Sequence, residues 1–329
     1  METKDVQVWE CGFHSKEKNV VSNEKNVIAT LDGTILTISG NGCMQSYGKT
    51  LYSYKYAPWY RLNITSVVIQ RGITNIGSCA FLDCYGITSV CIPDSVTCIG
   101  SDAFKNCTGL THITFSENLI SIGAGAFYGC AGLTSVTFLK NLKEIGIDAF
   151  KNCTGLTRIT FSENLISIDA RAFYGCASLT SITFLKNLKE IGYRAFQGCS
   201  KLKSITNLRL TPQIIPYLSD NNEDRNCSPF DGNILDGKLL IGKDKSITLF
   251  VPASAVNVYK NAPVWQCFCN IMPIAQDEQL EKIPTPEQVE EKFIQIDADV
   301  QRLEERIFEL MQCFKKYTYK TNTPVGKDL

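Results

Sequence analysis

The sequence predicts a solenoid of stacked parallel strands, with a β-hairpin at its N-terminal end and an amphipathic helix at its C-terminal end. In this chain of 329 residues the dipeptide Ala-Phe recurs six times, at intervals of 23 residues. Each unit also carries the alternating apolar residues of a strand. Because so short a unit cannot bury its own apolar face, neighbouring units must stack into one continuous core. The repeated phenylalanines are Phe81, Phe104, Phe127, Phe150, Phe173 and Phe196.

Three more columns of residues repeat with the same period. A Cys follows each Phe by three residues, an aliphatic residue follows each Cys by three, and an Ile precedes each Phe by five. Gly follows this Ile in every unit except one, where Asp169 stands. A partial unit with Val67, Val68 and Ile69 opens the series. We therefore expect each unit to form one coil, in which a strand is followed by a turn on the opposite side.

A second period of 46 residues lies over the first. Residues 103–148 match residues 149–194 at all but seven of 46 positions, so the duplicated unit was two coils. Six of the seven differences fall where the repeat pattern places side chains on the outside, and the exception is Val136/Ile182. The other differences are His112/Arg158, Gly123/Asp169, Gly125/Arg171, Gly132/Ser178, Ile147/Tyr193 and Asp148/Arg194.

Composition excludes some classes of protein. The 33 basic and 33 acidic side chains give a net charge of zero, which disfavours nucleic acids and anionic membranes as partners. No stretch approaches the roughly 20 apolar residues of a membrane helix. Residues Met1 to Glu10 are polar and do not resemble an export signal, so the cytoplasm is the default location.

The unit Gly-Leu-Thr-Ser-Val-Thr-Phe-x-x-x-Leu-x-x-Ile-Gly-x-x-Ala-Phe-x-x-Cys resembles the BspA-like (Treponema type) leucine-rich repeat. The flank from Thr34 to Tyr60 resembles the lead-in segment of Bacteroides-type members, and the flank from Phe250 to Trp265 resembles their closing segment. The resemblance covers roughly residues 27–274. It implies a leucine-rich-repeat solenoid with its strands on the concave face. Because members are typically surface or secreted binding and adhesion proteins, it also implies non-catalytic recognition of a protein or glycan.

The outward positions of the strands form a face lined with hydroxyl groups. Thr favours strands and packs well beside other Thr residues, which is a structural explanation; small polar side chains also leave an open surface for a ligand. His112 and Arg158 are the only large side chains in their column, so we expect them to set specificity. The candidate ligand-binding residues are Ser89, His112, Thr114, Ser135, Thr137, Arg158, Thr160, Ser181 and Thr183, and the outward columns also include Cys91, Ser204 and Thr206.

Three further columns have structural interpretations. Asn118, Asn141, Asn164 and Asn187 recur after the strands, where a stacked Asn can bond the backbone of its neighbour. Glu117, Lys140, Glu163 and Lys186 form an alternating ladder of charges that we expect to be exposed. The Cys column should consist of buried, unpaired thiols, because stacked coils point their Cβ atoms in the same direction. This column comprises Cys84, Cys107, Cys130, Cys153, Cys176 and Cys199.

We expect no metal, no cofactor and no enzymatic activity. His14 and His112 have no second His nearby, and Cys267-x-Cys269 lacks the partners of a zinc site. No nucleophile, base and orienting acid can be assembled from the repeat. An alternative to ligand binding is a structural spacer without a ligand, and an enzyme is the more distant alternative.

The ends of the repeat carry their own signals. The segment 27–39 predicts a hairpin around Asp32-Gly33 that caps the first coil. Residues 208–247 interrupt the frame and predict an expanded last coil, before a strand at 248–251 and a short helix at 254–261. The expected divisions are a cap (1–62), a solenoid (63–207), an irregular last coil with its cap (208–274), and a linker with a coiled-coil helix (275–329).

The C-terminal segment predicts a coiled coil over about residues 286–317. Thr285, Pro286 and Gln288 give the pattern of a capped helix start. Apolar residues then follow at alternating intervals of four and three, with β-branched residues and Leu at its centre, a pattern that favours a parallel homodimer. The alternative is one helix docked on the solenoid. The seam comprises Val289, Phe293, Ile296, Val300, Leu303, Ile307, Leu310, Phe314 and Tyr317.

Overall fold

The computed structural model describes residues 6–12, 27–49, 54–215, 230, 234–235, 238–239, 247–268 and 270–274. The chain divides into two compact units, Met1–Ile274 and Ala275–Leu329. The predicted coiled coil at 286–317 lies outside the described residues, and it stays a prediction.

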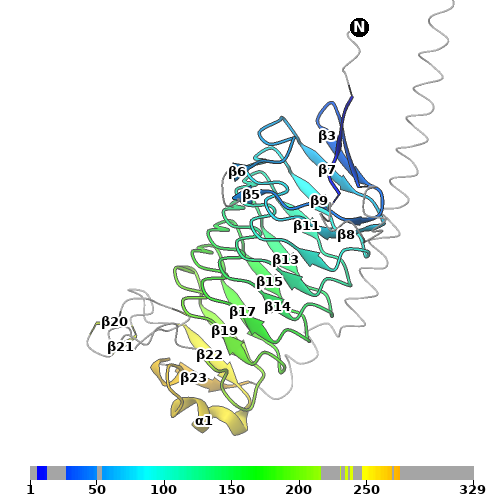
Figure 1. The fold of residues 1–329 in the computed structure, drawn as a ribbon. Coiled ribbons are helices and arrows are strands. Elements are labelled where there is room, and N and C mark those ends of the chain that lie inside the picture. Colours follow the sequence, from blue (N-terminus) through cyan, green and yellow to red (C-terminus); the bar gives the residue numbers. More distant parts are fainter. Residues whose placement is uncertain are drawn as a thin grey trace, which may run out of the picture. The chain divides into compact units, whose positions relative to one another are not determined.

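The repeat forms a solenoid in which each coil contributes strands to two opposite sides (Figure 1). Our expectation of a plain turn opposite each strand was incomplete, because the Ile column itself forms short parallel strands there. On the first side lie β7 (Ser66–Ile69), β9 (Ser89–Cys91), β11 (His112–Thr114), β13 (Ser135–Thr137), β15 (Arg158–Thr160), β17 (Ser181–Phe184) and β19 (Ser204–Asn207). The second sheet comprises β4 (Gly42–Cys43), β8 (Ile73–Ile76), β10 (Cys98–Ile99), β12 (Ser121–Ile122), β14 (Glu144–Ile145), β16 (Ser167–Ile168) and β18 (Glu190–Ile191).

Strands on the first side pair in parallel with a register of one repeat. Ser89 lies opposite both Ser66 and His112, and Ser135 lies opposite Arg158. The strands on this side nevertheless form three separate hydrogen-bonded sheets, because β11 is not paired with β13 and β15 is not paired with β17. Strands β11 and β15 occupy equivalent positions in the duplicated pairs of coils. The 46-residue period of the sequence therefore also appears in the backbone pairing.

The core is built on the phenylalanine column predicted from the repeat. Successive rings from Phe81 to Phe196 are stacked, with centroids 4.9–5.3 Å apart and interplanar angles of at most 15°. This spacing is close to the distance between neighbouring strands, about 4.8 Å. A second column packs edge-on against the first, as Phe115 does on Phe127, with centroids 5.7 Å apart. Each buried ring contributes roughly 2 kcal/mol, so the stack contributes substantially to stability.

The repeat cysteines are buried and free, as predicted. Each thiol from Cys107 onward donates a hydrogen bond to the Phe carbonyl of the preceding coil. The Sγ–O distance is 3.2 Å from Cys107 to Phe81, and 3.1–3.4 Å in the later coils. Burial raises the pKa of the thiols, to about 12 for Cys130. The column thus satisfies backbone acceptors as well as filling space, a role the sequence analysis did not anticipate.

Two polar ladders connect neighbouring coils. The predicted Asn ladder is confirmed: Asn118 Nδ2 donates to the carbonyl of Asp94 at 2.9 Å, and the three later asparagines repeat this bond. A threonine ladder was missed. Thr111 Oγ1 donates to the carbonyl of Thr88 at 3.1 Å, and Thr157 does the same to Thr134 at 3.0 Å. These bonds hold successive coils in register.

The predicted N-terminal hairpin is confirmed as β2 (Ile28–Asp32) and β3 (Ile35–Ser39), joined by Gly33 and Thr34. Gly33 has φ +61°, the positive value that a tight primed turn requires at its first position. A further strand, β1 (Gln7–Glu10), pairs antiparallel with β2, and β3 pairs in parallel with β7. The cap therefore continues the first side of the solenoid. A small hairpin of β5 (Gly48–Lys49) and β6 (Tyr54–Lys55) lies in the same lead-in segment.

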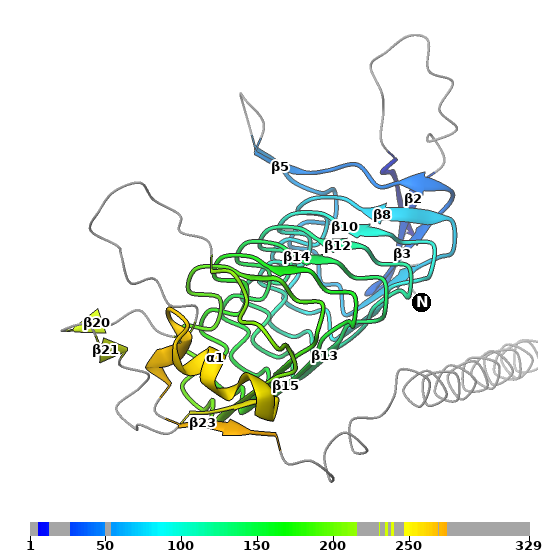
Figure 2. The same ribbon diagram turned by 90° about the horizontal axis from the view of Figure 1, so that it is seen from below.

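The next strand to pair with β19 is β22 (Thr248–Val251), as the predicted interruption of the frame requires, and Thr248 lies opposite Ser204. Most of residues 208–247 lie outside the described residues, so the form of the last coil stays a prediction. Two buried amide side chains pair where the chain leaves β19: Asn207 Nδ2 donates to Gln213 Oε1 at 2.7 Å. The predicted short helix is present, and it covers the C-terminal end of the coils (Figure 2). The short helix is α1 (Val256–Lys260), preceded by the 3-10 turn η2 (Ala253–Ala255). A second 3-10 turn, η3 (Trp265–Cys267), and the strand β23 (Asn270–Pro273) follow it. Between β19 and β22, β20 (Ile234–Leu235) and β21 (Lys238–Leu239) pair as a hairpin.

Candidate ligand-binding surface

The outward side chains of the first-side strands form two rows, which we call the strand face. Register defines both rows, because residues paired across neighbouring strands point to the same side. In the middle coils the first row carries His112 and Arg158, and the second row carries Thr114 and Thr160. The first row comprises Ile35, Ser66, Ser89, His112, Ser135, Arg158, Ser181, Ser204, Thr248 and Asn270. The second comprises Val8, Thr30, Thr37, Val68, Cys91, Thr114, Thr137, Thr160, Thr183, Thr206, Phe250 and Met272.

All nine predicted ligand-binding residues lie on the strand face. Seven of them are exposed, whereas Thr137 and Thr183 are half-buried. The aliphatic residues between them point inward, as the alternation predicts: Val136 is 1% and Ile182 2% exposed. The middle of this face is therefore a polar surface lined with hydroxyl groups, and it lies over an apolar core.

His112 and Arg158 lie on β11 and β15, two coils apart, with Ser135 on the strand between them. The His112 ring is held by a 2.9 Å contact between its Nδ1 and the hydroxyl of Thr111. Arg158 is exposed and lies opposite Ser135 in the register. Both side chains rise above neighbours that end at a hydroxyl or a methyl group, so they are the tallest features of the middle coils.

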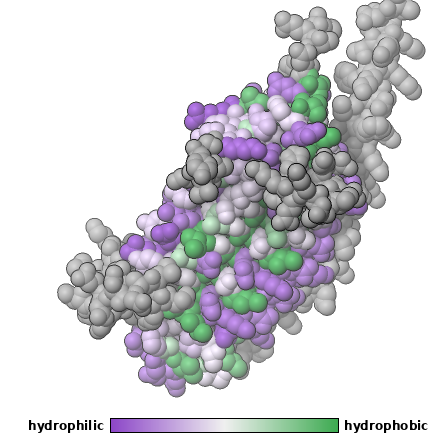
Figure 3. Space-filling model, in the orientation of Figure 1, coloured by the Kyte–Doolittle hydropathy of each residue, from purple (hydrophilic) through white to green (hydrophobic). Residues whose placement is uncertain are grey.

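The two ends of the strand face carry exposed apolar side chains, which were not predicted from the sequence. Val8 is 60% exposed, Ile35 48%, Val68 45% and Met272 50%. Hydrophobic atoms are visible near β3 in Figure 3. Val8, Ile35 and Met272 belong to cap strands, which do not follow the 23-residue frame, so no column pointed to them. Val68 lies in the partial unit that opens the repeat, one repeat before Cys91. The alternation of inward and outward side chains within each cap strand could have indicated these outward positions, but only with the pairing partner of the strand known.

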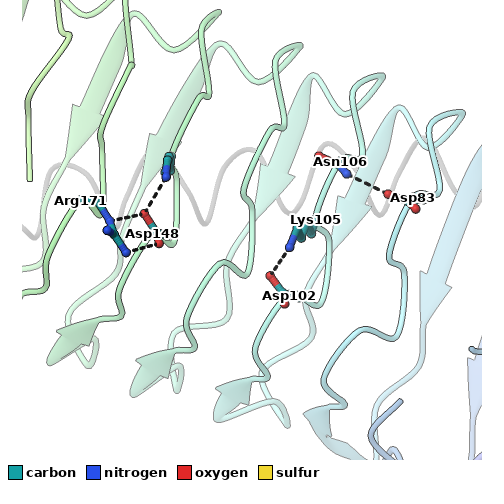
Figure 4. Close-up of polar contacts among 7 residues, drawn as sticks. Asp83, Asp102, Lys105, Asn106, Asp148 and Arg171 are labelled. Atoms are coloured by element: carbon teal, nitrogen blue, oxygen red, sulfur yellow. Dashed lines mark hydrogen bonds and ion pairs between the residues drawn. The ribbon is translucent and has the colours of Figure 1, made fainter. Parts of the chain in front are cut away.

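A second polar surface lies along the Ala-Phe-x-x-Cys turns, and we call it the turn face. Lys105, Tyr128, Lys151 and Tyr174 alternate there on successive coils. Lys151 Nζ lies 5.4 Å from the ring centroid of Tyr128 and 5.3 Å from that of Tyr174. Acids pair with these cations, since Lys105 Nζ lies 3.4 Å from Asp102 Oδ1 (Figure 4). The side chains of this face are held by one another, unlike those of the strand face.

Asp169, which replaces the repeat glycine, lies beside the second sheet. Burial raises the pKa of its carboxyl group, and the neighbouring carboxylates Glu144 and Glu190 raise it further. Within the described ranges, no group of three His, Cys, Asp or Glu residues could hold a metal ion. No helix in that part of the chain is long and apolar enough to cross a membrane.

Comparison with known proteins agrees with the repeat. Residues 54–154 and 120–215 match the family described as "BspA type Leucine rich repeat region (6 copies)". Among curated proteins no match to the chain is found.

Solved structures with similarity to the chain include three bacterial proteins. The leucine-rich repeat protein of T. pallidum is 23% identical over 57% of this chain and 86% of its own, with a TM-score of 0.41. A leucine-rich cell surface protein of Faecalibacterium prausnitzii is 20% identical over 79% of this chain and 74% of its own, with a TM-score of 0.37. The pneumococcal vaccine antigen PcpA is 15% identical over 78% and 98%, with a TM-score of 0.31. On the match of its repeats, this chain belongs to the BspA-type leucine-rich repeat family.

Proposed function

We propose that this chain is a non-catalytic binding protein that recognises a protein or glycan ligand on the middle of its strand face. The observation that carries the proposal is the make-up of that surface. Small hydroxyl side chains occupy nearly every outward position, and only His112 and Arg158 are large. We assign specificity to these two side chains and general adhesion to the hydroxyl groups.

Rigidity of the scaffold supports this assignment. The Thr and Asn ladders and the stacked rings hold each strand against its neighbours, so the surface loses little conformational entropy on binding. Each neutral hydrogen bond to a ligand contributes only about 1 kcal/mol. Useful affinity therefore requires many contacts along several coils, which an extended ligand lying across the strands can supply.

The two large side chains have different recognition chemistry. The Arg158 guanidinium presents a planar fork of donors that fits a carboxylate, sulfate or phosphate group. The His112 ring offers one nitrogen beyond the Nδ1 atom that contacts Thr111. A ligand with an anionic group and a polar group two coils apart, roughly 10 Å at the spacing of strands, matches this pair.

The test compares two double variants of the full chain. His112→Ser with Arg158→Ser removes the proposed specificity residues, while Lys143→Ser with Lys189→Ser removes two exposed cations from the side of the second sheet. Protein and glycan arrays first identify a ligand, and titration then gives its affinity. We expect at least a tenfold loss for the first variant and less than a twofold change for the control. Unchanged binding by the first variant would refute the assignment, and a chain that binds no ligand at all would support the spacer alternative.

We further propose that residues 286–317, which lie outside the described residues, form a parallel homodimeric coiled coil. The support is the apolar seam from Val289 to Tyr317 in the sequence. Light scattering on the full chain and on a chain ending at Gln276 tests the proposal. We expect a dimer for the full chain and a monomer for the truncated one. A full chain that remains monomeric at tens of micromolar would leave the docked helix as the explanation.

A further inference from the structure

One position of the turn face has the same unusual backbone in every coil. The residue before each Ala-Phe dipeptide has φ between +53° and +64°. Gly adopts this left-handed conformation freely and Asp tolerates it, whereas other residues are destabilised by about 1 kcal/mol. The last two coils nevertheless carry Arg171 and Arg194, both with φ +55°. The column comprises Cys79, Asp102, Gly125, Asp148, Arg171 and Arg194.

The duplication shows that neither arginine is required by the fold. Arg171 stands where the preceding pair of coils has Gly125, and Arg194 stands where it has Asp148. The backbone is the same in both copies, with φ +56° at Asp148 and +55° at Arg194. Both arginines are therefore residues that the backbone disfavours, at positions where the equivalent coils carry better-suited residues in the same conformation. Strain of this kind is found at functional sites more often than elsewhere.

Contacts within the protein account for Arg171. Its Nε donates to Asp148 Oδ1 and its Nη2 to Asp148 Oδ2, both at 2.9 Å (Figure 4). Asp148 also lies 3.5 Å from Lys151 Nζ. This bidentate pair on adjacent coils is the geometry in which Arg and carboxylate bind most strongly. Arg171 thus offsets its backbone strain with a structural ion pair.

Arg194 has no such compensation among the described residues. Its guanidinium carbon lies 4.5 Å from the ring centroid of Tyr193, and its Nε is buried without a hydrogen-bond partner. The residue three positions on is Gln197, at a position where the coils two and four earlier have Lys151 and Lys105, each paired to an aspartate. Gln197 Oε1 is also buried without a partner. Within the part of the chain that the structure describes, no acid pairs with this half-buried cation, and the carboxylate of a ligand would supply the missing charge.

We propose that Arg194 is the centre of a second binding site, which takes an Asp or Glu carboxylate of a protein partner. A single anionic group is indicated because the other turn-face cations near it, Lys151 and Arg171, are already paired with Asp148. A polyanionic glycan would need several unpaired cations in a row. Arg and Tyr are also the side chains that most often dominate protein interfaces, and Tyr193 lies against Arg194.

The experiment follows the guanidinium of Arg194 directly in the full chain. The Nε–H signals of the ¹⁵N-labelled protein are recorded by NMR while a peptide of alternating Glu and Gly is added. The same peptide with Gln in place of Glu is the uncharged probe, and a sulfated heparin-like oligosaccharide is the glycan probe. Arg194→Asn assigns the signal, because Asn tolerates the left-handed conformation, as Asn106 and Asn152 do with φ near +60°. Arg158→Asn on the strand face is the matched control, and melting curves check the fold of both variants.

We expect the Glu peptide to shift the Arg194 signal in a saturable way, with at least tenfold higher affinity than the Gln peptide. The shift should be lost in Arg194→Asn and kept in Arg158→Asn. Equal responses to the two peptides, or none, would overturn the proposal. Tighter binding of the oligosaccharide at Arg194 would replace the protein partner with an acidic glycan. Because Arg158 belongs to the strand face, its variant keeps this result separate from the test of the proposed function.

Discussion

The duplicated pairs of coils, residues 103–148 and 149–194, form nearly the same structure from nearly the same sequence. They share every ring of the phenylalanine column, every cysteine and the asparagine ladder. They differ at seven positions, among them three where the first pair has His112, Gly125 and Asp148 and the second has Arg158, Arg171 and Arg194. The comparison shows that the columns that build the core stayed the same, whereas the differences lie almost entirely outside the core, where the proposed recognition residues are found.

The largest expected effect is the loss of a stacked ring. Phe127→Ala and Phe173→Ala are equivalent changes in the two pairs of coils, and both rings are fully buried between two neighbours. We expect each to lower the free energy of unfolding by about 3–5 kcal/mol, because the cavity breaks the stack. Denaturant titration measures both, with Ser135→Ala as an exposed control. Losses that differ by more than about 1 kcal/mol would show that the two cores are not equivalent.

The buried thiols should be almost unreactive in the folded protein. Burial raises the pKa of Cys130 from 9.0 to about 12, so its thiolate fraction at pH 8 falls roughly a thousandfold. Burial likewise raises the pKa of Cys176, its equivalent, well above the usual value. Alkylation at pH 8 followed by mass spectrometry should therefore modify exposed Cys91 first and the column only in denaturant. Rapid alkylation of Cys130 in the folded state, or disulfides within the column, would contradict this account.

A smaller effect is expected from the asparagine ladder. Asn118 and Asn164 each donate one hydrogen bond of 2.9 Å to a carbonyl of the preceding coil. Replacement of either by Ala should lower the free energy of unfolding by about 1 kcal/mol, because the carbonyl loses its partner. Thermal melts of the two variants should give equal shifts. If the Asn118 variant melts at the wild-type temperature, solvent replaces the bond and the ladder is not stabilising.

The smallest effect concerns Asp169, which replaces Gly123 of the first pair. Its pKa is raised in the folded state, so its contribution is most favourable at acidic pH and is lost as the pH rises through the raised value. Asp169→Asn should therefore raise the melting temperature slightly at pH 7 and have little effect near pH 3. Glu117→Gln, at an exposed position away from Glu144 and Glu190, is the control. A decrease at pH 7 would show that the carboxylate is stabilising.

Much of the fold follows from the sequence because every coil meets a copy of itself. Each repeated residue packs on the equivalent residue of the next coil, so its neighbour is known from the spacing. The phenylalanine stack, the buried thiols and the asparagine ladder could therefore be predicted from the sequence alone. The same reasoning placed all nine candidate ligand residues, including His112 and Arg158, on one face. It did not reveal the second sheet, since two-residue strands such as Ser121–Ile122 are too short to show an alternation.

The sequence by itself determined which side chains repeat and whether each points inward or outward, because a constant period of 23 residues stacks like on like. Only the tertiary structure decided which residues contact the side chains that depart from the repeat pattern. It placed Arg171 against Asp148 and left Arg194 without an acid among the described residues. It also joined Val8 of the cap and Val68 of the opening unit to one row. The physical reason is that unlike residues on adjacent coils interact through local backbone angles and rotamers. A periodic pattern does not encode either of these.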